Sequence, residues 1–152
     1  MLFRSGQWLQ GMLLAQGLAR VESTADNRGL LLPMREIEDV ARAARLGIWS
    51  DPHFAVRSVD EMGEYLNRYE IVEGRVRATD QVDGRVYLNF GPDWRTDFTV
   101  SVAPADVRVF RRDGINLLTF AGQRVRVRGW VRALNGPMMD VTHPEQIQLL
   151  GP

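Results

Sequence analysis

The chain contains no cysteine and no lysine, and it has two histidines among its 152 residues. Without cysteine it can form neither disulfide bonds nor thiolate metal sites. His53 and His143 lie far apart in the sequence and each adjoins a proline, which disfavours a histidine-rich metal centre. A glycine-rich dinucleotide fingerprint and a P-loop pattern are also absent. We therefore expect neither a metal site nor a cofactor.

Long apolar runs are missing as well. No stretch is long and apolar enough to span a membrane, so we expect no membrane partner. The N-terminal apolar stretch is interrupted by Gln10, Gln16 and Gly17 and lacks a basic leader, which is not typical of a signal peptide. The cellular compartment stays open, since an export signal would have to lie in a longer parent chain.

Net charge is also lacking, because 19 arginines balance 19 acidic residues. No field of the whole molecule therefore attracts nucleic acid. Arginine nevertheless supplies every basic side chain, and its planar guanidinium suits phosphate groups and stacks on bases. A GC-rich genome favours arginine codons and would produce the same bias, so the composition alone does not establish a nucleic-acid partner.

The first part of the chain, residues 1–58, has helical periodicity. Met34, Ile37, Ala41 and Ala44 form one apolar stripe at spacings of three and four residues. An apolar stripe of this kind has to be covered. We expect it to pack on the rest of the chain or on a second copy, in which case the helical segment would be the interface of a homodimer.

The second part, residues 59–152, begins with a short predicted helix and then changes to a period of two, which is typical of β-strands. The predicted strands are 71–79, 86–90, 98–102, 124–133 and 138–142, and residues 146–150 complete the pattern. A long connection between the third and fourth strands is typical of an OB-fold. The sequence therefore predicts an α+β, mainly β fold, with a helical segment followed by a five-stranded OB-fold-like barrel.

Two motifs in the helical part resemble a known family. Residues Trp8–Val21 are similar to the helix and strand that close the staphylococcal-nuclease (thermonuclease) fold, and Arg35–Ser50 resemble its last helix with the closing Gly-Ile-Trp-Ser. In that family the catalytic arginines, the glutamate and the calcium-binding aspartates lie upstream, where this chain has residues 1–6. The tyrosines of the family's nucleotide pocket would fall at Ser23 and Ala25. The resemblance thus implies a relative of phosphodiester-hydrolysing nucleases that lacks the catalytic residues.

A second resemblance covers the barrel. Val86–Gly91, Asp97–Val100 and Gly122–Gly129, together with His143–Ile147, are similar to the accessory OB domain attached to some bacterial thermonuclease-family proteins. This resemblance implies a nucleic-acid-binding barrel rather than a reaction.

The predicted fourth strand carries a basic stripe. Val125, Val127 and Val131 point to one side of it. The residues that point to the other side are Arg124, Arg126, Arg128, Trp130 and Arg132, and the first strand pairs with them through Arg75 and Arg77. Like charges on neighbouring strands repel, so an anionic group is expected among them.

Two interpretations of this stripe are open. A nucleic-acid backbone could lie on the arginines with a base on Trp130, as in single-strand-binding proteins. Alternatively, Asp60, Glu61 and Glu64 of the short helix, together with Glu73, could neutralise the arginines, with Trp130 packed under that helix. We favour the second interpretation, because short-range pairing suits a chain without net charge.

OB-folds usually bind ligands on the outer face of strands two and three and at neighbouring loops. Tyr87, Asn89, Thr99 and Ser101 occupy that face in the predicted strands, and residues 93–97 and 134–137 form the loops. Tyr87 and Trp94 could stack bases and Arg95 could meet a phosphate. The predicted nucleic-acid-binding residues of both surfaces are Arg75, Arg77, Tyr87, Asn89, Trp94, Arg95, Arg124, Arg126, Arg128, Trp130 and Arg132.

The alternative for the 93–97 loop is structural, with Asp93, Arg95 and Asp97 forming salt bridges and Trp94 closing the end of the barrel. These three residues also form the nearest approach to a hydrolytic site, but a dedicated calcium site takes about six or more oxygen ligands. The sequence therefore favours a non-catalytic, nuclease-related module for single-stranded DNA or RNA. The alternatives are part of an active metal-dependent thermonuclease whose catalytic half is not in this chain, and an OB domain that serves as a protein scaffold.

Overall fold

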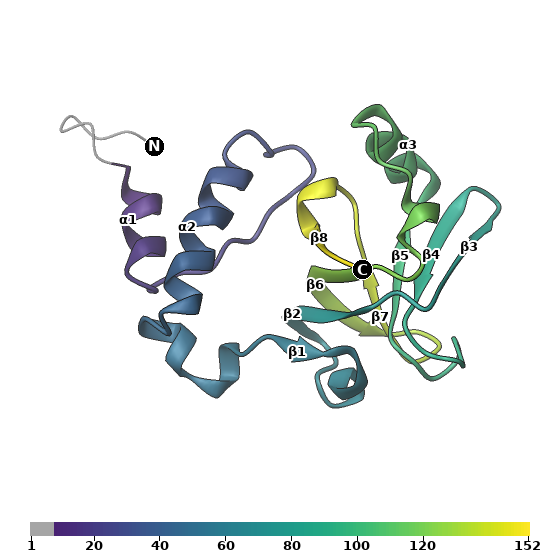
Figure 1. Ribbon diagram of the computed structural model, residues 1–152, viewed down its shortest axis with the longest axis horizontal. Helices are drawn as coiled ribbons and strands as arrows, with labels where there is room; N and C mark the ends of the chain where they lie inside the picture. Colours follow the sequence, from purple (N-terminus) through teal and green to yellow (C-terminus); the bar gives the residue numbers. More distant parts are fainter. Residues whose placement is uncertain (1–7) are drawn as a thin grey trace. The chain divides into compact units, whose positions relative to one another are not determined.

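The computed structural model describes residues 8–152 and divides the chain into two compact units, one ending at Ala55 and the other spanning Val56–Pro152 (Figure 1). We refer to them as the helical unit and the OB-like unit. The predicted boundary lay between residues 58 and 59, but residues 57 and 58 form a strand that pairs within the OB-like unit. Residues 1–7 of the predicted helical segment lie outside the described residues.

Over residues 8–55, the helical unit has two α-helices and two short 3₁₀ helices: α1 (Leu9–Ala15), α2 (Leu31–Ala43), η1 (Gly47–Ser50) and η2 (Pro52–Phe54). Leu14, Val21 and Leu31 form its small core, and Met34 and Ile37 of the predicted stripe pack against this core. This part of the stripe is therefore covered within the unit itself. The extended piece after α1, similar to a thermonuclease strand, forms no ladder in the described chain.

Glu38 anchors that extended piece to α2. Its carboxylate is fully buried and accepts a hydrogen bond from the backbone N–H of Val21. Arg42, one turn later, lies 3.4 Å from Glu38 and 2.6 Å from Asp39. A buried carboxylate is tolerated only with such partners, so this network fixes the path of residues 18–21.

A close backbone contact joins the end of α1 to the start of η1. Gly17 and Gly47 both have positive φ, at 68° and 52°, and the amide of Ile48 donates to the carbonyl of Gly17 at 2.8 Å. A Cβ atom on either glycine would collide with the backbone of the other segment. The Gly-Ile-Trp-Ser motif is thus held in place by two residues without side chains.

The OB-like unit is built from one mixed sheet with helices at its margins. Its strands are β1 (Arg57–Ser58), β2 (Arg68–Arg75), β3 (Ala78–Val82), β4 (Arg85–Asn89), β5 (Thr99–Val102), β6 (Arg124–Ala133), β7 (Pro137–Asp140) and β8 (Ile147–Gly151). Its helices are η3 (Val59–Glu64), α3 (Pro104–Arg112), η4 (Leu117–Phe120) and η5 (Pro144–Gln146).

The strand order is β1-β2-β6-β7-β5-β4-β3, and β8 pairs with β6 at Arg124–Val127, next to the part of β6 that pairs with β7. The pairs β1–β2 and β5–β7 are parallel and the others antiparallel. This arrangement confirms the predicted α+β, OB-like fold. The expected five-stranded OB-fold-like barrel is an eight-stranded mixed sheet that is not closed, because no ladder between described residues joins β2 to β3.

The predicted first strand, 71–79, is in fact two strands. The amide of Val76 still donates to Gln123 beside β6, whereas the amide of Arg77 donates to Asn89 at the end of β4. The chain therefore changes partner between these two residues. Through this change the chain passes from β2, near one end of the strand order, to β3 at the other end. The covalent link between β2 and β3 therefore connects the two ends of the sheet.

The core of the OB-like unit lies on the concave side of this sheet. Val72, Leu88, Val100 and Val127 are almost completely buried there. The long connection contains α3, which adds the buried Phe110 to the core. The short helix expected after residue 58 is the 3₁₀ helix η3, with Ser58 and Glu61 forming its capping box.

None of the helices in residues 8–152 combines the length and the apolar character needed to cross a membrane.

Candidate nucleic-acid interface

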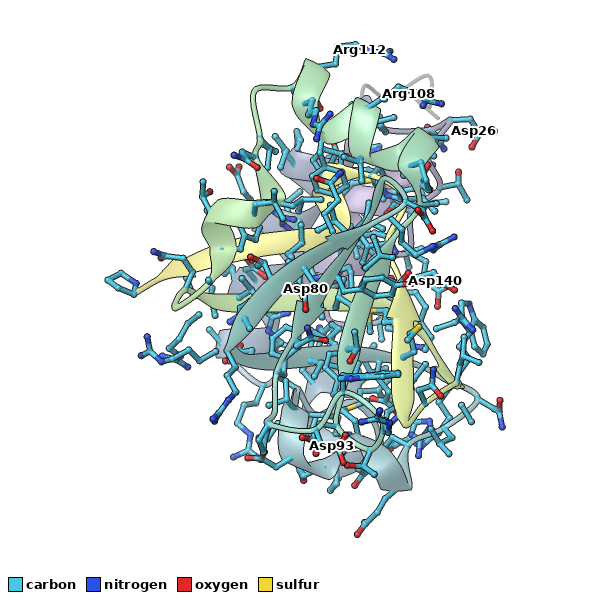
Figure 2. The ribbon with its side chains drawn as sticks, turned by 90° about the vertical axis from the view of Figure 1, so that its right-hand side faces the viewer. Asp26, Asp80, Asp93, Arg108, Arg112 and Asp140 are labelled. Atoms are coloured by element: carbon cyan, nitrogen blue, oxygen red, sulfur yellow. The ribbon has the colours of Figure 1, made fainter. Side chains whose placement is uncertain are left out.

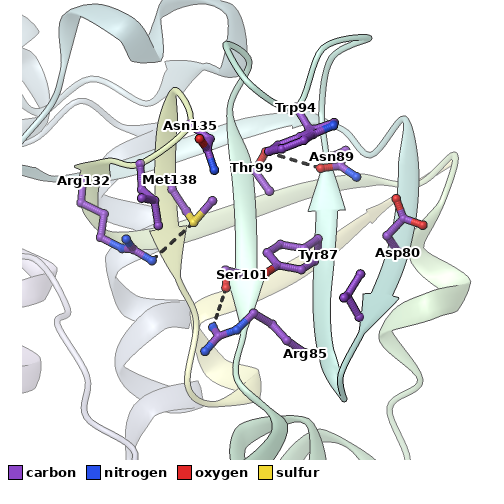
Figure 3. Close-up of a pocket in the computed structure, with 12 residues that line it drawn as sticks. Asp80, Arg85, Tyr87, Asn89, Trp94, Thr99, Ser101, Arg132, Asn135 and Met138 are labelled. Carbon is purple, nitrogen blue, oxygen red and sulfur yellow. Dashed lines mark hydrogen bonds between the residues drawn. The ribbon is translucent and has the colours of Figure 1, made fainter.

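A groove of about 600 Å³ lies on the outer face of β3, β4, β5 and β7 (Figure 3). Figure 2 faces this surface, with Asp80 of β3 and Asp140 of β7 on opposite sides of it. The residues that line the groove are Asp80, Val82, Arg85, Tyr87, Asn89, Trp94, Thr99, Ser101, Arg132, Leu134, Asn135 and Met138. All of them belong to the OB-like unit.

Strand alternation places the polar side chains in the groove. Val86 and Leu88 of β4 point into the core, so Arg85, Tyr87 and Asn89 point outward. In the ladder with β5, Tyr87 lies opposite Ser101 and Asn89 opposite Thr99. The outer face of the predicted second and third strands is therefore the floor of the groove, as their pattern indicated.

Trp94 forms one rim of the groove and is 49% exposed. The carboxylate of Asp97 accepts the backbone N–H of Asp93 at 2.8 Å, and Asp93 accepts that of Arg95 at 3.0 Å. The loop also touches the β6–β7 turn at Gly136, where φ is 80° and a Cβ would lie 2.6 Å from the carbonyl oxygen of Thr96. Contacts within the protein therefore hold this rim of the groove in place without a ligand.

The alternative role for this loop is only partly realised. Arg95 lies 4.0 Å from Asp93, and both side chains are more than half exposed, so their ion pair adds little stability. The guanidinium of Arg95 instead stacks over the Trp94 ring at 4.6 Å. The prediction that Trp94 closes the barrel end is wrong, because its ring lines the groove.

Two arginines supply the positive charge of the groove. Arg85 donates to the Ser101 hydroxyl at 2.8 Å. Arg132 forms two hydrogen bonds with the carboxylate of Asp140, at 2.6 and 3.1 Å. This pairing raises the pKa of the Arg132 guanidinium against the opposing effect of burial, so the side chain stays charged and is held in one orientation.

Figure 3 shows how the two chemistries are distributed. Trp94 lies at the upper end of the groove, Tyr87 near its centre and Arg85 at the lower end, with Arg132 at the side. Asp80 adds one negative charge opposite the arginines. The groove thus offers aromatic rings at one end and guanidinium groups at the other, with a small net charge.

In the basic stripe of β6, Arg124 and Arg126 are paired with a carboxylate of the neighbouring strand. Val125, Val127 and Val131 point into the core and the arginines point outward, as the alternation predicted. Glu73 of β2 lies 2.6 Å from Arg126 and 3.7 Å from Arg124. We call Glu73, Arg124 and Arg126 the Glu73 cluster. One carboxylate pairs with two arginines, so the cluster is neutralised in part and keeps a formal charge of +1. Internal pairing of this kind is the interpretation that the balanced charge favoured.

The short helix η3 was expected to neutralise the arginines and to cover Trp130, and the structure gives it another role. The carboxylate of Glu61 accepts the backbone N–H of Ser58 at 2.7 Å and so caps η3. Trp130 is 63% exposed, so the prediction that it packs under this helix is wrong. Its ring meets Tyr69, its partner on β2, edge to face at 6.2 Å.

The remaining basic residues lie apart from the groove lining. Arg128 is buried, with 3% of its surface exposed, so it is not available to a ligand on the outer face. Arg75 donates to the carbonyl of Gly122 at 2.6 Å. Arg77 is exposed just after β2, where the chain changes partner.

Four of the predicted residues come together in the groove: Tyr87, Asn89, Trp94 and Arg132. Arg95 joins them at the rim through its stack on Trp94. The sequence reasoning missed Arg85, although this residue follows the Asp83-Gly84 turn and has the same parity as Tyr87. It also missed Asp80, because the break in the first strand was not foreseen.

The part of the chain that the structure describes contains no group of three His, Asp or Glu side chains placed to hold a metal ion.

No protein-family model and no curated protein matches this chain. Among solved structures it is similar to a putative aspartyl-tRNA synthetase from Leishmania major Friedlin, at 12% identity over 66% of this chain and 21% of that one, with a TM-score of 0.47. It is similar to asparaginyl-tRNA synthetase from Pyrococcus horikoshii (18% identity, 64% and 23%, TM-score 0.42). The p204 HINb domain is similar at 13% identity (63% and 47%, TM-score 0.40).

The chain spans about a fifth of the length of either synthetase. At these identities its function has to be inferred from the groove itself. The thermonuclease resemblance of the helical unit gains no support from these comparisons.

Proposed function

We propose that the groove binds single-stranded nucleic acid, with bases against Trp94 and Tyr87 and phosphate groups at Arg85 and Arg132. The observation that carries this proposal is the convergence of two aromatic rings and two guanidinium groups in one groove. A nucleotide presents the complementary pair, a flat ring and an anion. Stacking needs the faces of unpaired bases, which single strands offer and duplexes do not.

The groove suits this ligand better than the basic stripe does. Arg126 and Arg132 are each paired with a carboxylate at 2.6 Å. The Arg126 side chain is 19% exposed, whereas that of Arg132 is 42% exposed and lines the groove, so Arg132 is more accessible to a phosphate. Asn89 and Asn135 add amide groups that can meet base edges. The small net charge of the site points to modest affinity.

Salt dependence tests the assignment of the two arginines. For a single strand, the logarithm of the binding constant falls with the logarithm of salt concentration by about 0.7 per neutralised phosphate, hence about 1.4 for two. The Arg85→Ala/Arg132→Ala variant is expected to lose most of that slope. Anisotropy titrations of labelled single-stranded DNA and RNA at several salt concentrations measure it.

The matched control is Arg77→Ala, which removes an exposed arginine outside the groove. This variant should keep the salt slope of the unmodified protein. If Arg77→Ala removed the slope and the groove variant kept it, the phosphate contacts would lie elsewhere. If no oligonucleotide bound even at low salt, the proposed function would be wrong.

We further propose that the module is nuclease-related and non-catalytic. The support is that α1 falls on the first thermonuclease-like motif and η1 on its Gly-Ile-Trp-Ser. The alternative, part of an active metal-dependent nuclease, requires an in-frame upstream segment with Asp-x-x-Asp-Thr and a later Arg-Tyr-Gly-Arg. Sequencing upstream of the codon for Met1 decides between them.

A homodimer through the helical unit is a separate proposal. It is supported by the exposure of Leu9, Met12 and Leu13 on α1 and of Val40 on α2, because apolar surface of this kind is often covered by a partner. Sedimentation over a range of concentrations tests it. A monomer at every concentration would contradict it.

A further inference from the structure

Trp130 lies outside the groove but is connected to it through the sheet. The ladders place Tyr87 of β4 opposite Ser101 of β5, and Ser101 beside Asp140 of β7. In the next ladder Val131 of β6 lies opposite Met139, so Trp130 is the outward neighbour of Asp140. One row of outward positions therefore crosses four strands, from Tyr87 through Ser101 and Asp140 to Trp130.

A nucleic-acid strand can cross the middle of this row without meeting an unpaired negative charge. Ser101 is 1% exposed and its hydroxyl accepts a hydrogen bond from Arg85, so a guanidinium group lies at this position of the row. The charge of Asp140 is neutralised by its two hydrogen bonds from Arg132. Arg132 lines the groove and lies two residues from Trp130, on the same side of β6. One guanidinium therefore borders both the groove and the Trp130 surface.

Trp130 is itself suited to stacking. It is the most exposed tryptophan of the OB-like unit, at 63%. The strand on its other side holds the ring at one edge through Tyr69, with an angle of 81° between the ring planes. Such support orients the indole and leaves most of its surface to solvent.

We propose that a bound single strand continues from the groove over Arg132 to Trp130, which stacks one further base. This inference rests on the proposed function of the groove. The span from Tyr87 to Trp130 is three strand spacings, about 14 Å. OB-folds bind roughly 4–16 nucleotides, so a strand that fills the groove has enough length to reach Trp130, whereas a dinucleotide seated at Trp94 and Tyr87 does not.

The test uses two ligands, a thymidine dinucleotide and an oligothymidylate of about twelve nucleotides. The full chain is labelled with 5-fluorotryptophan, and the ¹⁹F signals of Trp94 and Trp130 are assigned with Trp94→Phe and Trp130→Phe. The dinucleotide is expected to shift the Trp94 signal alone. The longer strand is expected to shift both signals.

Affinities of Trp130→Ala complete the test. This variant should weaken binding of the longer strand by about five- to a hundredfold, as for one stacked base, and leave the dinucleotide unchanged. The matched control is Leu149→Ala, which removes another exposed apolar side chain from the same sheet and should change neither affinity.

The failures of the two proposals are distinguishable. If the longer strand shifts Trp94 but not Trp130, and Trp130→Ala binds it normally, the groove stands and the extension to Trp130 is wrong. If neither ligand shifts Trp94, the proposed function fails and the extension fails with it.

Discussion

Replacing Glu70 by alanine is expected to lower the free energy of unfolding of the OB-like unit by about 3 kcal/mol. Glu70 is 2% exposed and lies 3.4 Å from Arg57 and 3.0 Å from Arg68. Arg57 has only 10% of its side chain exposed and stacks over Tyr65 at 4.1 Å. Without the carboxylate, the buried Arg57 guanidinium would lose its ion pair with Glu70, and breaking a buried ion pair by removing one partner is costly.

The two carboxylate oxygens of Glu70 face different arginines. The Oε1 atom of Glu70 is close to the Nε of Arg68, yet it accepts no hydrogen bond. The Oε2 atom accepts a hydrogen bond from the Nε of Arg57 at 3.4 Å, so one hydrogen bond and the charge attraction to Arg68 together stabilise the carboxylate. Glu70→Gln should accordingly be destabilising as well, since it keeps the shape and removes the charge.

Chemical denaturation of the full chain, followed by a signal assigned to the OB-like unit, measures the effect. Glu64→Ala is the matched control, because Glu64 is an exposed glutamate of η3, shortly before β2 in the same unit, and such a change usually costs less than about 0.5 kcal/mol. The Glu70→Met/Arg57→Met double variant should be more stable than Glu70→Met alone. Equal stability of Glu70→Ala and Glu64→Ala would show that the ion cluster is dispensable.

Removing both aromatic rings of the groove is expected to give the largest loss of binding. Tyr87→Ala/Trp94→Ala should weaken single-stranded oligonucleotides by about 30-fold or more, since each stacked base contributes about 1–3 kcal/mol. Both side chains are on the outer face and partly exposed, so folding should be little affected. Anisotropy titrations at one fixed salt concentration measure the loss.

The control for this variant keeps the rings and changes their polar groups. Tyr87→Phe/Trp94→Phe should bind within a few-fold of the unmodified protein, because phenylalanine also stacks on bases. If the alanine variant bound as tightly as the phenylalanine variant, stacking would not be the source of affinity in this groove.

The strand alternation and the side-chain chemistry of the sheet could be read from the sequence. The alternation on β4 and β5 predicted correctly that Tyr87, Asn89, Thr99 and Ser101 share one face. It also separated the valines of β6 from its arginines. These predictions succeed because a period of two depends only on local backbone geometry.

The pairing of charges could not be read in the same way. Arg132 and Arg126 belong to the same stripe, yet Asp140 orients one toward the groove and Glu73 neutralises the other. Which partner each arginine meets depends on the register between strands far apart in the sequence. The break between Val76 and Arg77 is likewise a product of tertiary pairing, and it brings Asp80 to the groove.

The sequence pattern also did not predict which charged side chains are buried. Glu38 lies within a helix whose spacing suggests a solvent-facing carboxylate, but it is fully buried and accepts the backbone N–H of Val21. Glu70 is buried in the same way by two arginines from other segments. Both sites depend on segments that meet only in the folded chain.

We propose that single-stranded nucleic acid binds in the groove of β3, β4, β5 and β7 and not on the Glu73 cluster. Amide chemical shifts of the full chain, followed during titration with a single strand of about twelve nucleotides, test it most directly. The groove predicts the largest shifts at Tyr87, Ser101 and Asn135 and in the 93–97 loop. Largest shifts at Glu73, Arg124 and Arg126, or no shifts at any concentration, would contradict it.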